Sequence, residues 1–118
     1  MGKNISKNVV AFIFSMLLVT ILSTFDITSV GNKAFSKYTK ATSLTLGNKL
    51  KTIGQNAFSN NKKLKKITIK STKLNKIGKN AFKGIHKKAV FKLPKSKLKS
   101  YKKLIKKAGV GKKVTYKK

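Results

Sequence analysis

The chain has 118 residues, a hydrophobic fraction of 40% and a formal net charge of +29. All 30 basic residues are lysines, whereas Asp26 is the single acidic residue, His86 is the single histidine, and cysteine is absent. This composition excludes a disulfide framework, a catalytic pair of carboxylates and a metal site built from clustered histidine, cysteine and acidic side chains. The sequence therefore predicts a protein that is not an enzyme and that holds no cofactor and no metal.

Residues 1–25 have the composition of an export signal. Lys3 and Lys7 precede an apolar run from Val9 to Phe25, which is the order found in secretory signal peptides. A membrane anchor through residues 9–25 is an open alternative, because a run of this size is within the range that can span a bilayer. Cleavage stays open, and in either case we expect a secreted or cell-surface protein of a Gram-positive-like bacterium.

Three near-identical hexamers recur after this segment at a nearly constant interval. They are Val30–Phe35, Ile53–Phe58 and Ile77–Phe82. A period of about 20–30 residues is typical of a solenoid, in which each unit buries its apolar face against its neighbours. We expect repeats over residues 26–93, with units near 27–49, 50–73 and 74–93.

Each hexamer predicts a structural core. The glycines are expected where a Cβ would block the backbone or a close approach, and the alanines leave room between stacked turns. The phenylalanines recur once per unit, and periodic aromatic residues of this kind are usually buried, so we expect them to form a ladder. The core residues are Gly31, Ala34, Phe35, Gly54, Ala57, Phe58, Gly78, Ala81 and Phe82.

An apolar pair follows each hexamer and flanks one outward position, as in a short strand with one buried face. The same interval predicts a last strand at residues 114–116, paired with Phe91–Leu93. The fold class is therefore a solenoid of about three to four short parallel strands with irregular or short helical returns. The apolar pairs are Leu44 and Leu46, Ile67 and Ile69, and Phe91 and Leu93.

The outward positions of these strands form rows if the units stack in register. One predicted row contains Thr45, Thr68, Lys92 and Thr115, and a second contains Ser43, Lys66 and Val90.

The pattern Leu-x-x-Ile-Gly-x-x-Ala-Phe, followed by Leu-x-x-Ile-x-Ile, resembles the BspA-like (Treponema pallidum-type) leucine-rich repeats over roughly residues 27–93. The third unit departs from it, with Lys88 at the position of Leu64. The resemblance implies a surface-exposed module for binding or adhesion and does not imply one chemistry. The second unit carries the motif most fully, in Leu50, Ile53, Gly54, Ala57, Phe58, Leu64, Ile67 and Ile69.

Residues 94–118 are rich in lysine and are expected to close the repeats. Ser96 is a candidate N-cap for a helix over about 96–108, and Gly109 is a candidate for ending it. Leu98, Tyr101 and Ile105 share its apolar face. Two interpretations are open: the helix caps the last repeat, or it lies on a membrane as cationic amphipathic peptides do.

The excess of lysine over acidic residues predicts an anionic partner. We expect a polymer such as teichoic acid or an acidic glycan, an anionic lipid surface, or another surface protein. Nucleic acid should bind only nonspecifically, because lysine lacks the planar fork with which arginine reads bases. Candidate contacts are Lys66, Lys70 and Lys92 on the strands and Lys99, Lys102, Lys103, Lys106 and Lys107 on the helix.

Two further functional hypotheses remain at this point. The chain could be a membrane-active cationic factor that works through its C-terminal helix, or a non-functional fragment of a longer surface protein.

Overall fold

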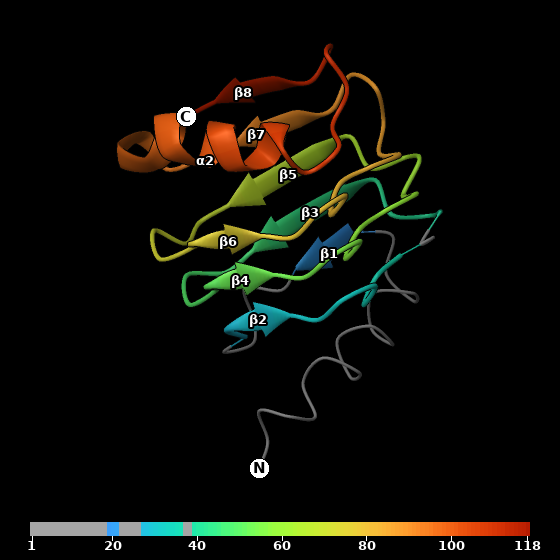
Figure 1. The fold of residues 1–118 in the computed structure, drawn as a ribbon. Helices are drawn as coiled ribbons and strands as arrows, with labels where there is room; N and C mark the ends of the chain where they lie inside the picture. Colours follow the sequence, from blue (N-terminus) through green and yellow to red (C-terminus); the bar gives the residue numbers. More distant parts are fainter. Residues whose placement is uncertain (1–18, 22–26, 37–38) are drawn as a thin grey trace.

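The structure is a computed structural model, which describes residues 19–21, 27–36 and 39–118 (Figure 1). These residues form two parallel sheets and a short C-terminal helix. The larger sheet contains, in this order, β1 (Val19–Ile21), β3 (Ser43–Leu46), β5 (Lys66–Ile69), β7 (Val90–Lys92) and β8 (Thr115–Lys117). The smaller sheet contains β2 (Ser29–Val30), β4 (Thr52–Ile53) and β6 (Lys76–Ile77).

The strands pair with the same interval that separates the hexamers. Ser43 of β3 pairs with Lys66 of β5, and Lys66 pairs with Val90 of β7. Because the register advances by the sequence period at each step, each residue lies beside its equivalent in the next unit. Figure 1 shows the result, in which the two sheets grow in the same direction from the N-terminal to the C-terminal units.

The expectation of irregular or short helical returns is wrong for the segments that lead into each hexamer. These segments form β2, β4 and β6, so the described residues contain eight strands in two sheets rather than three to four strands. The physical reason is that stacked returns also place equivalent backbone groups side by side. The N–H of Gly54 donates to the carbonyl of Val30, and the N–H of Gly78 donates to that of Ile53, both at 2.7 Å.

The register of the last strand also differs from the prediction. The sequence interval pairs residues 114–116 with Phe91–Leu93, but the structure pairs Phe91 with Tyr116 and Lys92 with Lys117. The interval is longer here than the repeat period, because the connection from β7 to β8 contains a helix and does not repeat the earlier units. Lys117, rather than Thr115, is therefore the neighbour of Lys92.

Strand β1 lies inside the segment predicted as an export signal. Its backbone pairs with β3, Val19 with Ser43 and Thr20 with Leu44, at the interval of the other units. The rest of residues 1–25, and with it most of the predicted signal or anchor, lies outside the described residues. Within the described part of the chain, no helix is long and apolar enough to cross a membrane.

The phenylalanines of the hexamers form a stack through the core. The rings of Phe35 and Phe58 lie 5.3 Å apart and 3° from parallel, and those of Phe58 and Phe82 lie 5.5 Å apart and 6° from parallel. Phe91 then meets Phe82 edge-on, with a centroid distance of 5.1 Å and an interplanar angle of 84°. All four side chains are at most 2% exposed, so the ladder is core and not a ligand platform.

The fourth residue of each hexamer has a left-handed backbone conformation, which the repeat pattern does not predict. The φ angles are 59° at Lys33, 57° at Asn56 and 58° at Asn80. Asparagine tolerates this conformation, whereas lysine incurs a steric cost in it. The first unit therefore carries local backbone strain that the other two avoid.

Lys33→Asn should raise the free energy of unfolding by up to about 1 kcal/mol, because it removes this strain. The backbone hydrogen bond from the N–H of Lys33 to the carbonyl of Gln55 is unaffected by the change. Chemical denaturation of the two proteins measures the difference. A loss of stability would show that the lysine side chain contributes a contact worth more than the strain.

The C-terminal helix begins later than predicted and without the expected cap. A 3-10 turn, η2 (Lys95–Lys97), follows Pro94, and α2 (Leu98–Lys106) begins with no side-chain cap, so Ser96 is inside the turn. Tyr101 and Ile105 are at most 1% exposed. In Figure 1, α2 lies at the C-terminal end of the stacked units, and it contacts both β6 and β8. The buried part of the apolar face of α2 therefore packs on the last repeat, as expected of a cap.

The hydroxyl of Tyr101 ties this helix to the repeats. It donates to the carbonyl of Ser71 at 2.8 Å and accepts from the N–H of Leu74 at 3.0 Å. Burial raises the pKa of Tyr101 above its ordinary value of 10.0, although the bond from Leu74 opposes this. Its contribution to stability is complete below about pH 10 and is lost as the pH rises through the raised pKa.

Tyr101→Phe should lower the free energy of unfolding by about 1–3 kcal/mol, because it leaves a buried N–H and a buried carbonyl without this partner. Urea unfolding at neutral pH measures the loss. Above pH 10 the difference in the free energy of unfolding between the parent and the variant should become smaller. If this difference stayed constant as the pH rose above 10, the result would contradict the role of the neutral phenol.

Candidate functional site

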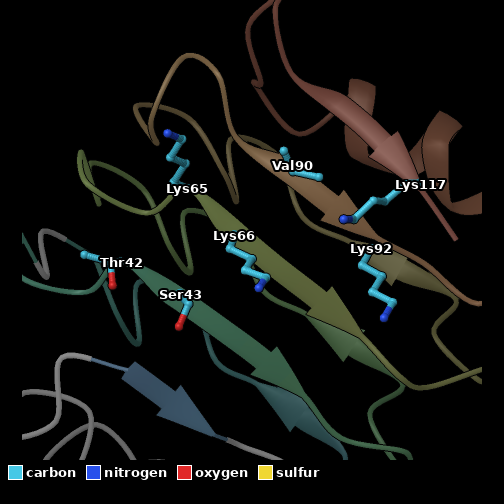
Figure 2. A pocket seen from close by; sticks show the side chains of 7 residues that line it. All are labelled: Thr42, Ser43, Lys65, Lys66, Val90, Lys92 and Lys117. Atoms are coloured by element: carbon cyan, nitrogen blue, oxygen red, sulfur yellow. The ribbon is translucent and has the colours of Figure 1, made fainter.

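A hollow of about 360 Å³ lies on the outer face of the five-stranded sheet (Figure 2). Its lining comes from four strands and the residues just before two of them, because the parallel register places equivalent positions in one row. The lining residues are Thr42, Ser43, Lys65, Lys66, Val90, Lys92 and Lys117.

Three of the lysines lie near Val90 on three neighbouring strands. Lys66 is the register partner of Val90, Lys92 is two residues further along β7, and Lys117 is the register partner of Lys92. Parallel strands lie about 4.8 Å apart, and residues two apart on one strand face the same side. In Figure 2, Lys66, Lys92 and Lys117 extend over the same part of the sheet, whereas Lys65 extends away from it. We call Lys66, Lys92 and Lys117 the lysine triad.

The electrostatics of the lysine triad are unfavourable when no anion is present. Lys92 and Lys117 lie directly opposite each other, and like charges in this arrangement destabilise a sheet. All three side chains are exposed, and the chain has one acidic residue to set against 30 lysines. A bound anion would therefore relieve repulsion within the triad.

The structure brings together some of the predicted contact residues and separates others. Lys66 and Lys92 line the hollow, whereas Lys70 is exposed just after β5 and does not line it. Lys117 and Lys65 were not predicted, and Lys117 was missed because the expected register placed Thr115 beside Lys92. The predicted helix lysines, Lys99, Lys102, Lys103, Lys106 and Lys107, are exposed and do not line the hollow.

Two of these helix lysines have local roles near β8. The Nζ of Lys102 lies 5.4 Å from the ring centroid of Tyr116. Lys106 lines a second hollow of about 360 Å³ together with Val110, Val114 and Tyr116. The helix lysines therefore form a charged surface, but they do not gather around the hollow on the five-stranded sheet.

A polar hollow of about 530 Å³ lies over the three-stranded sheet. Its floor includes Gly31, Gly54 and Gly78, and the Oδ1 of Asn32 accepts the N–H of Gln55 at 2.8 Å. Gly54 and Gly78 are required by the close stacking of the units, since a Cβ on Gly54 would lie 2.5 Å from Asn32 Oδ1 and one on Gly78 would overlap the backbone of Gln55. Packing between the units therefore accounts for the residue types that line this hollow.

The described residues offer no material for a metal centre. Among them, no group of three or more histidine, cysteine or acidic side chains is close enough to hold a metal ion. His86 is half-buried in a loop, where its Nδ1 accepts the N–H of Lys88 at 3.0 Å. The histidine therefore has a local structural partner.

A model of the BspA type leucine rich repeat region, with six copies, matches residues 3–108. The chain belongs to this family. The match confirms the resemblance seen in the repeats and extends beyond residues 27–93 on both sides. Comparison with curated proteins and with solved structures finds no match.

Membership of the BspA-type family places the chain among proteins that are generally secreted or surface-exposed. Their repeats typically serve protein interaction rather than catalysis. The two parallel sheets, built from stacked units, are consistent with an extended interaction surface of this kind.

Proposed function

We propose that the chain is an exported BspA-type solenoid that binds anionic polymers of the cell envelope or the extracellular matrix through the outer face of its five-stranded sheet. The observation that carries the proposal is the lysine triad, which gathers three exposed ammonium groups over one hollow. Teichoic acid and acidic glycans are the polymers best placed to meet an exported protein.

The net charge of +29 supports the same partner class. Charges of one sign on a small domain repel one another and oppose compaction. Salt screens this repulsion over about 8–10 Å, and a bound polyanion relieves more of it. Binding and folding should therefore be linked, since any ligand that prefers the folded state stabilises it.

Export rests on the order of Lys3, Lys7 and the apolar run that follows them. A cut after Ser23 or Thr24 would remove β1 and leave β3 as the edge of the larger sheet. Mass spectrometry of the protein recovered from the cell surface tests both points. Recovery from the cytoplasm alone would contradict export.

The membrane-active alternative has less support. Tyr101, Ile105 and Ala108 are at most 1% exposed because they pack on the last repeat. A helix whose central apolar residues are covered in this way should bind anionic vesicles without permeabilising them. Release of a trapped dye by the full-length chain would favour the alternative.

The direct test is binding of the full-length chain to teichoic acid, heparin and duplex DNA over a salt series. We expect binding to all three polymers at low salt and a steep loss with rising salt, because counterion release drives such binding. Binding to teichoic acid or heparin that outlasts binding to DNA would indicate recognition beyond charge. Absence of teichoic acid and heparin binding at low salt would refute the proposal.

A further inference from the structure

We propose that the lysine triad is a discrete site for a phosphate monoester carried on a sugar or glycerol. The inference rests on the proposed function, because the same face of the sheet carries both. It adds a specific ligand group at one place, whereas polymer binding can use lysines over the whole surface.

The first argument is that the positive charge on this face is local. The row of outward positions that crosses the sheet contains Thr45, Thr68, Lys92 and Lys117 in register. Equivalent positions thus change from threonine on β3 and β5 to lysine on β7 and β8. A repeat surface that is only solvated does not require lysine in place of threonine. The adjacent pair of Lys92 and Lys117 also reduces stability, because like charges lie opposite each other.

The second argument is the number of donors and their arrangement. The three lysines come from three adjacent strands, and their positions do not lie in one row, because Lys66 is level with Val90 whereas Lys92 and Lys117 are level with each other two residues further along. A phosphate monoester presents three acceptor oxygens and about −1.5 to −2 charges at neutral pH. A carboxylate or a phosphodiester linkage offers two free oxygens and one charge, so the monoester fits the triad best.

The third argument concerns the rest of the hollow. Its lining includes the half-buried side chain of Val90, and the hydroxyls of Thr42 and Ser43 lie at the β3 side. Figure 2 shows these hydroxyls beyond Lys66, on the side away from Lys92 and Lys117. A hollow of about 360 Å³ is at the small end of the range for organic ligands. A carbon scaffold with hydroxyls can cover Val90 and reach Ser43, which a free phosphate ion cannot do.

The test compares two variants of the full-length chain that lose the same charge. The sheet variant is Lys66→Gln, Lys92→Gln and Lys117→Gln, and the helix variant is Lys99→Gln, Lys103→Gln and Lys107→Gln. The probes are glucose 6-phosphate, glucose 6-sulfate and inorganic phosphate, and calorimetry measures binding at moderate salt. The two esters share one scaffold, so the comparison between them isolates the anionic group.

We expect the parent chain to bind glucose 6-phosphate about tenfold more tightly than either other probe. The sheet variant should lose at least about tenfold in affinity for it, because charge-assisted hydrogen bonds are lost, whereas the helix variant should change by less than about threefold. Binding of the phosphate ester should weaken below about pH 6, where the ligand takes up a proton, and binding of the sulfate ester should not. The sheet variant should unfold at no lower temperature than the parent, since it removes an unfavourable lysine pair.

A second set of probes separates the two natural sources of the group. Phosphatidic acid carries a monoester headgroup, whereas phosphatidylglycerol carries a diester. A preference for phosphatidic acid vesicles assigns the site to a lipid headgroup. Equal binding to the two vesicles, with glucose 6-phosphate still bound, assigns it to a sugar phosphate. Either result supports the monoester site.

Three results would overturn the inference: no binding of glucose 6-phosphate by the parent, equal binding of the phosphate and sulfate esters, or equal losses in the two variants. Polymer binding by the parent would remain in each case, so the proposed function would stand without the discrete site. Absence of teichoic acid and heparin binding by the parent at low salt would instead refute the proposed function itself.

Discussion

Phe58→Ala is expected to lower the free energy of unfolding by about 3–5 kcal/mol. Phe58 is 0% exposed, and its ring is stacked between Phe35 at 5.3 Å and Phe82 at 5.5 Å. Truncation therefore removes ring contacts on both sides and leaves a cavity between units that cannot close without shifting the strands. A loss of this size is comparable with the whole stability of a small domain.

Thermal unfolding with circular dichroism measures the effect, and Phe58→Leu is the control. Leucine fills part of the space and retains hydrophobic burial, so its cost should be smaller than that of alanine. An alanine variant that melts with the parent would show that the phenylalanine stack does not hold the units together.

Gly78→Ala is expected to be the second most damaging change, although it adds a single methyl group. The new Cβ would overlap the backbone N of Gln55 and lie 2.6 Å from the backbone C of Gly54. Backbone atoms cannot move aside as a flexible side chain can, so the units would have to separate. Overpacking of this kind costs about 1–3 kcal/mol, and occasionally more.

Gly111→Ala is a matched control for this prediction. Apart from its chain neighbours, no residue has an atom within 4 Å of a Cβ at Gly111, and its φ is not in the left-handed region. The control should unfold with the parent or slightly above it, because alanine restricts the unfolded chain. Equal melting temperatures for the two alanine variants would contradict close stacking at Gly78.

The repeat interval was sufficient to predict the parts of the fold that depend on stacking. Equivalent residues one period apart lie side by side in a parallel register, so the phenylalanine ladder and the row of Ser43, Lys66 and Val90 follow from counting. The second sheet was not predicted, because strands of two residues are too short to show an alternating pattern. Their pairing comes from the stacking of the returns.

The candidate site could be predicted only in part. Lys66 and Lys92 were expected on the outer face, since both lie at outward positions of repeating strands. Lys117 could not be placed, because the helical connection to β8 sets an interval longer than the repeat period. The lysine triad therefore depends on a non-repeating segment, and this is why the sequence predicts a charged face but not a hollow.

The left-handed residues show a similar limit. Asn56 and Asn80 are residue types that accept a positive φ, but Lys33 at the same position is not, and its conformation is imposed by the stacked backbone. The hydrogen bond from Lys33 N–H to Gln55 O at 2.9 Å joins it to the next unit. Tertiary pairing thus overrides a local preference.

The link between folding and anion binding is tested most directly by thermal unfolding of the full-length chain with added teichoic acid. The reference is the same chain in sodium chloride of equal ionic strength. If the lysine-covered fold binds the polymer, the melting temperature should rise on the order of 10 °C when the polymer exceeds its Kd by about 100-fold. Matched salt should give a smaller rise, because it only screens repulsion. A rise that salt alone reproduces, or no rise at all, would contradict the link between folding and anion binding.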